Sequence, residues 1–71
     1  MKRDFYVVCD YENNYCDCRE AYALHTSVKD VVYNARSFAR YLGVYNDYRF
    51  VHVTVYDGVD YDGPVVFEAW S

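Results

Sequence analysis

The chain has 71 residues, of which 54% are hydrophobic and 21% aromatic, and its formal net charge at pH 7 is −4. This length accommodates one domain and excludes a second hydrophobic core. The acidic balance argues against direct binding to DNA or RNA, because such binding requires a basic surface.

The N-terminal third of the chain predicts a β-hairpin. Residues 4–12, DFYVVCDYE, are rich in the β-branched and aromatic residues that favour strands. The Asn-Asn pair at 13–14 tolerates the positive φ of a tight turn. Residues 15–25, YCDCREAYALH, then return as a second strand, although the alanines and leucine of its second half also accept a helix.

A helix is predicted to follow, capped by Thr26 or Ser27. Asp30 stands three residues after Ser27, in a position that resembles a capping box. Apolar residues then recur with the spacing of one buried helix face. They are Val28, Val31, Val32, Ala35, Phe38, Ala39 and Leu42. Gly43 follows as the expected C-cap.

Two strands are predicted in the C-terminal third. Residues 48–58 alternate in polarity, and the face that carries Val51, Val53 and Val55 is the better candidate to meet the helix. The opposite face carries Phe50, His52, Thr54 and Tyr56. Residues 63–71 form the last strand, and Pro64 belongs at its start or on an edge because proline cannot donate to a ladder.

The element order β-β-α-β-β predicts a single α+β domain over residues 1–71. We expect a four-stranded antiparallel or mixed sheet with one amphipathic helix packed on one face. The other face of this sheet is left to solvent or to a partner.

Charge is distributed unevenly along the chain. Segment 27–42 carries Lys29, Arg36 and Arg40 against Asp30, a net charge of +2, so the remaining residues carry −6. No apolar run approaches about 20 residues and the N-terminus lacks a signal-peptide pattern. With three cysteines, an odd number, these features predict a cytoplasmic protein without membrane contact.

The aspartate-rich stretch YDGVDYDG, residues 56–63, invites comparison with a calcium loop. Such a loop requires D-x-[DN]-x-[DN]-G with a glutamate six residues beyond the glycine. Here the aspartates are spaced three and two apart, and Glu68 comes five residues after Gly63. The expectation is therefore a hairpin connection without a metal ion or cofactor.

The cysteines offer a weak zinc signal, a single C-x-C without a second pair. If the Asn-Asn pair is a two-residue turn, Cys9 faces Cys18 and Asp10 faces Asp17, which is unfavourable. The expectation is that the cysteines are free and behave as small hydrophobic residues. No spacing selects a nucleophile with its base, and so small a domain lacks a deep pocket, so no enzyme activity is expected.

Tyrosine is the strongest compositional oddity, with ten copies in 71 residues. A core of this size cannot bury ten tyrosines with their hydroxyl groups satisfied, so several must lie on the surface. Exposed tyrosine is favoured at protein interfaces. The alternative is that tyrosine is present as a good strand residue on a half-wet sheet.

Carboxylates accompany these tyrosines. Rows of carboxylates on strands can imitate a phosphate backbone and occupy a basic groove, whereas the alternative is an acidic face that only keeps the domain soluble. The expected partner-binding residues are Asp57, Asp60, Asp62, Tyr56 and Tyr61, supported by Asp10, Glu12 and Asp17.

In size, acidity, aromatic content and hairpin–helix–strand plan, the chain resembles small phage-encoded inhibitors. The comparison is with anti-CRISPR proteins and with host-takeover proteins that bind RNA polymerase, and it covers the whole chain as architecture. The resemblance implies a protein that acts by binding, often by blocking a nucleic-acid groove or a nuclease site, with no chemistry of its own.

The leading hypothesis is thus an acidic inhibitor that engages a basic, nucleic-acid-handling host protein. A second hypothesis is a structural or homo-oligomeric domain that pairs with its copy through an exposed strand edge at VVFEAW, residues 65–70. A third is a metal-binding or redox module.

Overall fold

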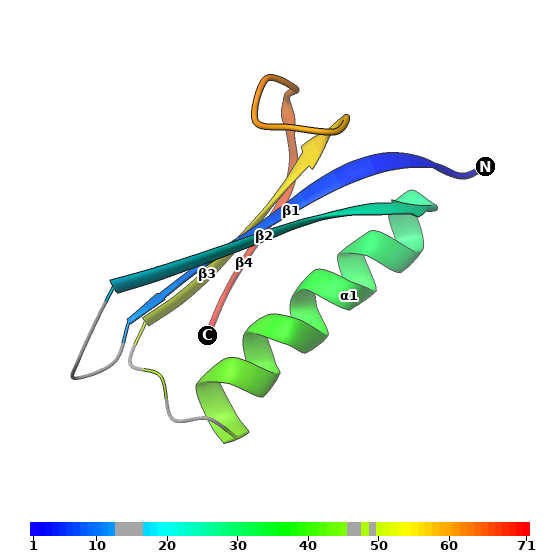
Figure 1. Cartoon of the computed structure of the whole chain (residues 1–71). Coiled ribbons are helices and arrows are strands. Elements are labelled where there is room, and N and C mark those ends of the chain that lie inside the picture. Colours follow the sequence, from blue (N-terminus) through cyan, green and yellow to red (C-terminus); the bar gives the residue numbers. More distant parts are fainter. Residues whose placement is uncertain (13–16, 46–47, 49) are drawn as a thin grey trace.

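A computed structural model describes residues 1–12, 17–45, 48 and 50–71 of the chain. Four strands form one antiparallel sheet in the order β2-β1-β3-β4, and a single helix, α1, packs on one face (Figure 1). The strands are β1 (Arg3–Glu12), β2 (Asp17–Thr26), β3 (Phe50–Asp57) and β4 (Val65–Trp70), and α1 spans Val28–Arg40. The predicted α+β class is confirmed, and the sheet is antiparallel rather than mixed.

The register of the β1–β2 hairpin differs from the one that a two-residue turn imposes. Asp10 faces Arg19 and Cys9 faces Glu20, so the pairing of Cys9 with Cys18 that a two-residue turn would give does not occur. The register is shifted by two residues, which keeps every side chain on its expected face but replaces two facing aspartates by an ion pair. The Asn-Asn turn itself and Cys16 lie outside the described residues.

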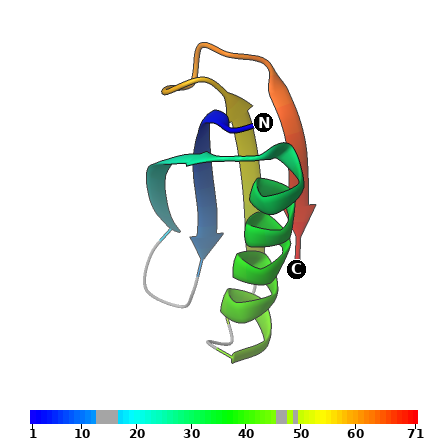
Figure 2. The ribbon, with the colours of Figure 1, turned by 90° about the vertical axis from the view of Figure 1, so that its right-hand side faces the viewer.

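The helix lies mainly across β3 and β4, as Figure 2 shows. Its start is as predicted, because Ser27 is the N-cap and its Oγ accepts a hydrogen bond from Asp30 N at 3.2 Å. Its buried face meets the valine face of β3, which confirms that prediction. The core consists of Phe5, Val7, Cys9, Val31, Ala35, Ala39, Leu42, Val51, Val53 and Val55.

Two details of the helix prediction are wrong. Val28 is 43% exposed, so the buried stripe of α1 begins at Val31, which is fully buried. Gly43 is not a C-cap, since the helix passes into a π-helical turn at Tyr41–Tyr45. Glycine is needed there for space: a Cβ atom at position 43 would collide with the side chain of Ser71.

The connection between β3 and β4 forms the end of the molecule drawn in orange in Figure 1. Asp57 N donates to the carbonyl of Pro64 at 2.9 Å and closes the connection. Gly58 adopts a φ of +118°, a conformation that side chains disfavour. A Cβ atom at Gly63 would strike the carbonyl oxygen of Asp57. Both glycines therefore shape the loop that carries the predicted aspartates, and Pro64 stands just before β4, as expected.

Candidate partner-binding face

The face of the sheet opposite α1, called here the open face, is built by strand alternation. Residues of β1 whose side chains point away from the helix are Asp4, Tyr6, Val8, Asp10 and Glu12, the even-numbered positions. The register places Asp17, Arg19, Ala21, Ala23 and His25 of β2 beside them, and Phe50, His52, Thr54 and Tyr56 of β3 on their other side. Of the elements in the described part of the chain, only the β3–β4 loop folds toward this face.

Three tyrosines form a cluster at the loop end of the open face. Tyr6 and Tyr56 face each other across β1 and β3. Tyr61 comes from the loop and packs edge-on against both, with ring centroids 5.0 Å from Tyr6 and 5.9 Å from Tyr56. Edge-to-face aromatic pairs stabilise such an arrangement. Tyr61 remains 48% exposed, so the cluster presents a fixed aromatic surface to its surroundings.

The cluster has a defined electrostatic environment. The pKa of the Tyr6 hydroxyl is raised, first by its hydrogen bond with Tyr61 and further by partial desolvation and by the charges of Tyr61 and Asp60. The loop thus brings a carboxylate close to the tyrosines. Asp60 is itself held by the loop, because its Oδ1 accepts a hydrogen bond from Asp62 N at 2.9 Å.

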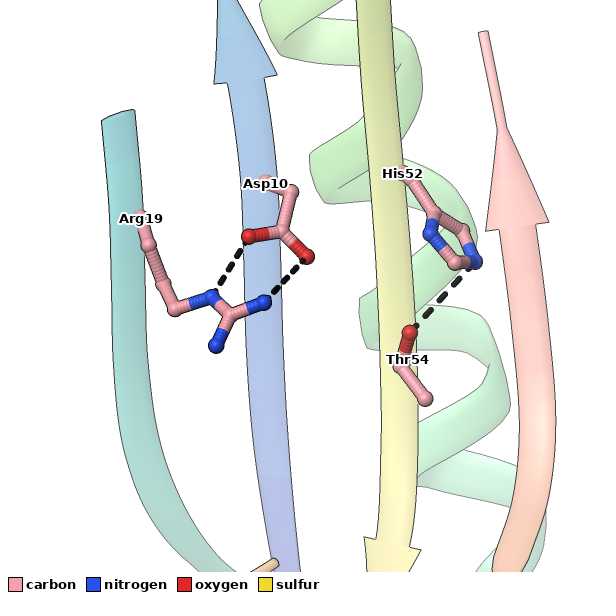
Figure 3. Close-up of polar contacts among 4 residues, drawn as sticks. All are labelled: Asp10, Arg19, His52 and Thr54. Carbon is pink, nitrogen blue, oxygen red and sulfur yellow. Dashed lines mark hydrogen bonds and ion pairs between the residues drawn. The ribbon is translucent and has the colours of Figure 1, made fainter. Parts of the chain in front are cut away.

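Arg19 borders the cluster on the β2 side. Its Nε and Nη2 donate to the two carboxylate oxygens of Asp10 at 2.6 and 3.3 Å, as Figure 3 shows. Asp10, followed by Tyr61, raises the pKa of Arg19 above its ordinary value. Asp10 therefore lies on the predicted face, but its charge is compensated within the protein.

Asp57 does not lie on the open face. Its register position is opposite Phe5, on the helix side of the sheet, and its Oδ1 pairs with Arg3 Nε at 3.3 Å. Together with its backbone contacts to Pro64 and Gly63, this pairing makes Asp57 a residue that holds the loop in place. The structure thus separates it from Asp60 and Asp62, which are exposed at the loop tip.

Glu12 and Asp17 form a second acidic point at the opposite end of the open face. They face each other directly across β1 and β2, an arrangement that repulsion disfavours. In the described part of the chain neither has an ion-pair partner. They line a cavity of about 240 Å³ with Phe50, which is 47% exposed. Tyr6 and Glu12 are six positions apart on β1, so the two acidic points lie about 20 Å apart.

The prediction omitted several residues of the open face. Tyr6 was not singled out, although strand alternation from Asp10 and Glu12 would have placed it there. His52 stacks on Trp70 of β4, with ring centroids 4.7 Å apart and nearly parallel planes. His52 Nε2 also lies 3.0 Å from Glu68 Oε1. It lies 3.4 Å from Thr54 Oγ1, a contact drawn in Figure 3. Only knowledge of the strand order would have revealed this group.

The residues that could act as nucleophiles or metal ligands are dispersed over the described part of the chain. Cys9 is free and fully buried, and burial, with smaller effects from Glu20 and Asp10, raises the pKa of its thiol to about 11. Cys18 is disulfide-bonded, so the expectation that it is a free thiol is wrong. Across the described residues, no group of three or more His, Cys, Asp or Glu side chains is arranged to hold a metal ion.

Comparisons with known proteins return no matching family model, no matching curated protein and no matching solved structure. Within the described ranges, no helix is both long and apolar enough to cross a membrane.

Proposed function

We propose that this chain is a non-enzymatic inhibitor of the phage or mobile-element kind, acting in the cytoplasm. Its open face occupies a basic site on a nucleic-acid-handling host protein. The observation that carries the proposal is the cluster of Tyr6, Tyr56 and Tyr61, a fixed and half-exposed aromatic surface. It is bordered by the loop carboxylates Asp60 and Asp62, which have no ion-pair partner among the described residues.

The cluster has the properties of a binding anchor. Tyrosine is enriched among the residues that contribute most to interface affinity. Because Tyr61 is held by two ring contacts, little side-chain entropy remains to be lost on binding. The anchor is thus preorganised in the free protein.

Carboxylates at both ends of the face supply orientation. Asp60 and Asp62 stand at the loop end, and Glu12 and Asp17 at the other, about 20 Å away. Such a spread of negative charge steers the encounter with a basic groove, and this attraction weakens as the salt concentration rises. Asp10 and Asp57 have weaker roles in this proposal, since Arg19 and Arg3 already compensate their charges.

The charge component is tested by two variants with the same change in net charge. Asp60→Asn with Asp62→Asn removes two charges at the open face, whereas Glu20→Gln with Asp30→Asn removes two exposed charges elsewhere. The assay measures whether the protein displaces DNA from bacterial RNA polymerase and from a CRISPR effector complex. We expect the first variant to lose at least about tenfold in inhibition at low salt and the second to retain it.

Two outcomes contradict this proposal. If both variants inhibit equally, the loop carboxylates do not contribute to recognition. If neither target loses DNA binding in the presence of the unaltered protein, a nucleic-acid-handling partner of these two kinds is excluded.

A second candidate function is homo-oligomerisation through β4. This strand is at the edge of the sheet, and Val65, Val66 and Trp70 are 50, 37 and 60% exposed. An edge strand with apolar side chains is a template for pairing with another chain. Sedimentation of the purified protein tests this candidate, because it predicts a stable dimer in the absence of any partner.

A further inference from the structure

We propose that the outer edge of β4 and the groove beside it bind an extended acidic peptide segment as a fifth strand. The sheet edge supplies backbone hydrogen bonds and the C-terminal half of α1 supplies positive charge. The groove and its arginines lie on the helix side of the sheet, away from Tyr61 and the loop carboxylates, so the inference does not rest on the proposed function.

The hydrogen-bonding groups of the edge follow from the β3–β4 ladder. Ser71 N donates to Val51 O at 3.2 Å, so the backbone of Ser71 points toward β3. Because the backbone groups of successive strand residues point alternately to the two sides, those of Trp70 and Glu68 point outward. Within the part of the chain that the structure describes, no strand pairs with this side of β4.

A groove runs beside this edge on the helix side. It has a volume of about 350 Å³ and is lined by Arg36 and Arg40 of α1, Val44 of the following turn, and Ala69, Trp70 and Ser71 at the end of β4. In this space, side chains of an added strand would project toward the helix on alternate positions.

The arginines define the chemistry of the occupant. Arg36 and Arg40 are four residues apart and thus lie on the same side of α1. Arg36 is held over the Phe67 ring at 5.2 Å, and neither arginine has a carboxylate partner among the described residues. In a chain with eleven acidic residues, two uncompensated guanidinium groups beside a free strand edge favour glutamate or aspartate side chains on the incoming strand.

A second copy of the chain fits this surface less well. Antiparallel pairing of two β4 edges would place two helices side by side across the junction, and Arg36 and Arg40 of both copies would then face one another. A nucleic acid would use the two charges but not the outward N–H and C=O groups. An acidic β-strand uses both features.

The test uses a blocked peptide of alternating valine and glutamate, about ten residues long, and a matched peptide with lysine in place of glutamate. Trp70 is the only tryptophan of the chain. Its ring stacks on His52 beside the outer edge of β4 and the residue borders the groove, so its fluorescence reports binding at this edge. We expect saturable binding of the glutamate peptide and at least about tenfold weaker binding of the lysine peptide. Arg36→Glu with Arg40→Glu should reverse this preference.

The strand-addition component is tested at Glu68. Glu68→Pro removes the outward N–H, which an edge strand tolerates, whereas Glu68→Ala removes the side chain and keeps the N–H. The proline variant should bind the glutamate peptide about tenfold more weakly than the alanine variant. If the proline variant does not fold, the reversal of charge preference decides the question alone.

Four results would overturn the proposal: equal binding of the two peptides, equal binding by the two Glu68 variants, binding of a single-stranded oligonucleotide that displaces the peptide, or a dimer that Glu68→Pro dissociates. The last result would assign the edge to a second copy of the chain. Asp60→Asn with Asp62→Asn should leave peptide binding unchanged, which separates this test from that of the open face.

Discussion

The two faces of the sheet are made from the same strands and differ in almost every property. On β3, Val51, Val53 and Val55 are fully buried under α1, whereas His52 and Tyr56, which alternate with them, are partly exposed on the open face. The helix face holds the domain together through apolar packing. The open face carries ring stacks, ion pairs and uncompensated carboxylates. In a domain this small, a strand period of two allows one set of residues to stabilise the fold and leaves another set exposed on the opposite face.

The largest expected effect lies on the helix face. Phe5 is fully buried in the core, and Phe5→Ala should lower the free energy of unfolding by about 3–5 kcal/mol. Because small domains have little stability to spare, this loss approaches complete unfolding. Chemical denaturation measures it, and Phe5→Leu, which keeps most of the volume, should cost under about 1.5 kcal/mol. A mild effect of the alanine variant would show that the core is not the main source of stability.

The loop between β3 and β4 should be the next most sensitive region. Gly63→Ala forces a Cβ atom against the Asp57 carbonyl, whereas Gly58→Ala meets no atom within 4 Å and suffers only from its positive φ. We expect about 1–2 kcal/mol of destabilisation for Gly58→Ala and more for Gly63→Ala. The reverse order in denaturation experiments would contradict the loop geometry.

Alkaline pH should lower the stability of the fold through Cys9, a core residue on the helix face of the sheet. Burial raises the pKa of the Cys9 thiol from 9.0 to about 11, so the folded protein favours the neutral thiol more strongly than the unfolded chain does. This contribution to stability is complete below about pH 9 and is lost progressively as the pH rises to about 11. The pKa of Tyr22 is also raised by its burial, which acts in the same direction.

Denaturant unfolding at several pH values measures this dependence. Cys9→Ala should have a smaller decrease in stability between about pH 9 and pH 11, with the tyrosine contribution remaining. An identical pH profile for the variant and the unaltered protein would exclude a role of the thiol.

The smallest effect is expected on the open face. The Asp10–Arg19 pair has good geometry, but the arginine side chain is 59% exposed. Arg19→Ala should therefore lower the free energy of unfolding only slightly, and less at high salt than at low salt. A larger loss that does not depend on salt would show that Arg19 contributes through its contact with Tyr61 rather than through its charge.

The elements and their faces could be predicted because their signals are local. The valine alternation of β3 and the apolar stripe of α1 each depend on residues close in sequence, and Ser27 marks its own helix start. The end of α1 could not be predicted, because the space requirement at Gly43 comes from Ser71, which is distant in sequence.

The candidate site could be predicted only in part, because it depends on long-range pairing. Asp60, Asp62, Tyr56 and Tyr61 do lie together around the β3–β4 loop. Asp57 is separated from them because its register places it opposite Phe5. The charge of Asp10 is compensated because the hairpin register is shifted by two residues from the one that a two-residue turn imposes, which brings Arg19 opposite Asp10. Neither register is encoded in the strand that carries the aspartate.

The central claim, that the open face is the contact surface, is tested most directly by two matched tyrosine variants. Tyr61 is 48% exposed on the open face, and Tyr33 is 74% exposed on α1. Displacement of DNA from RNA polymerase or a CRISPR effector complex is measured for Tyr61→Ala and Tyr33→Ala. The account predicts that Tyr61→Ala loses at least about tenfold in inhibition and that Tyr33→Ala retains it. Equal inhibition by the two variants, or loss with Tyr33→Ala alone, would contradict the claim.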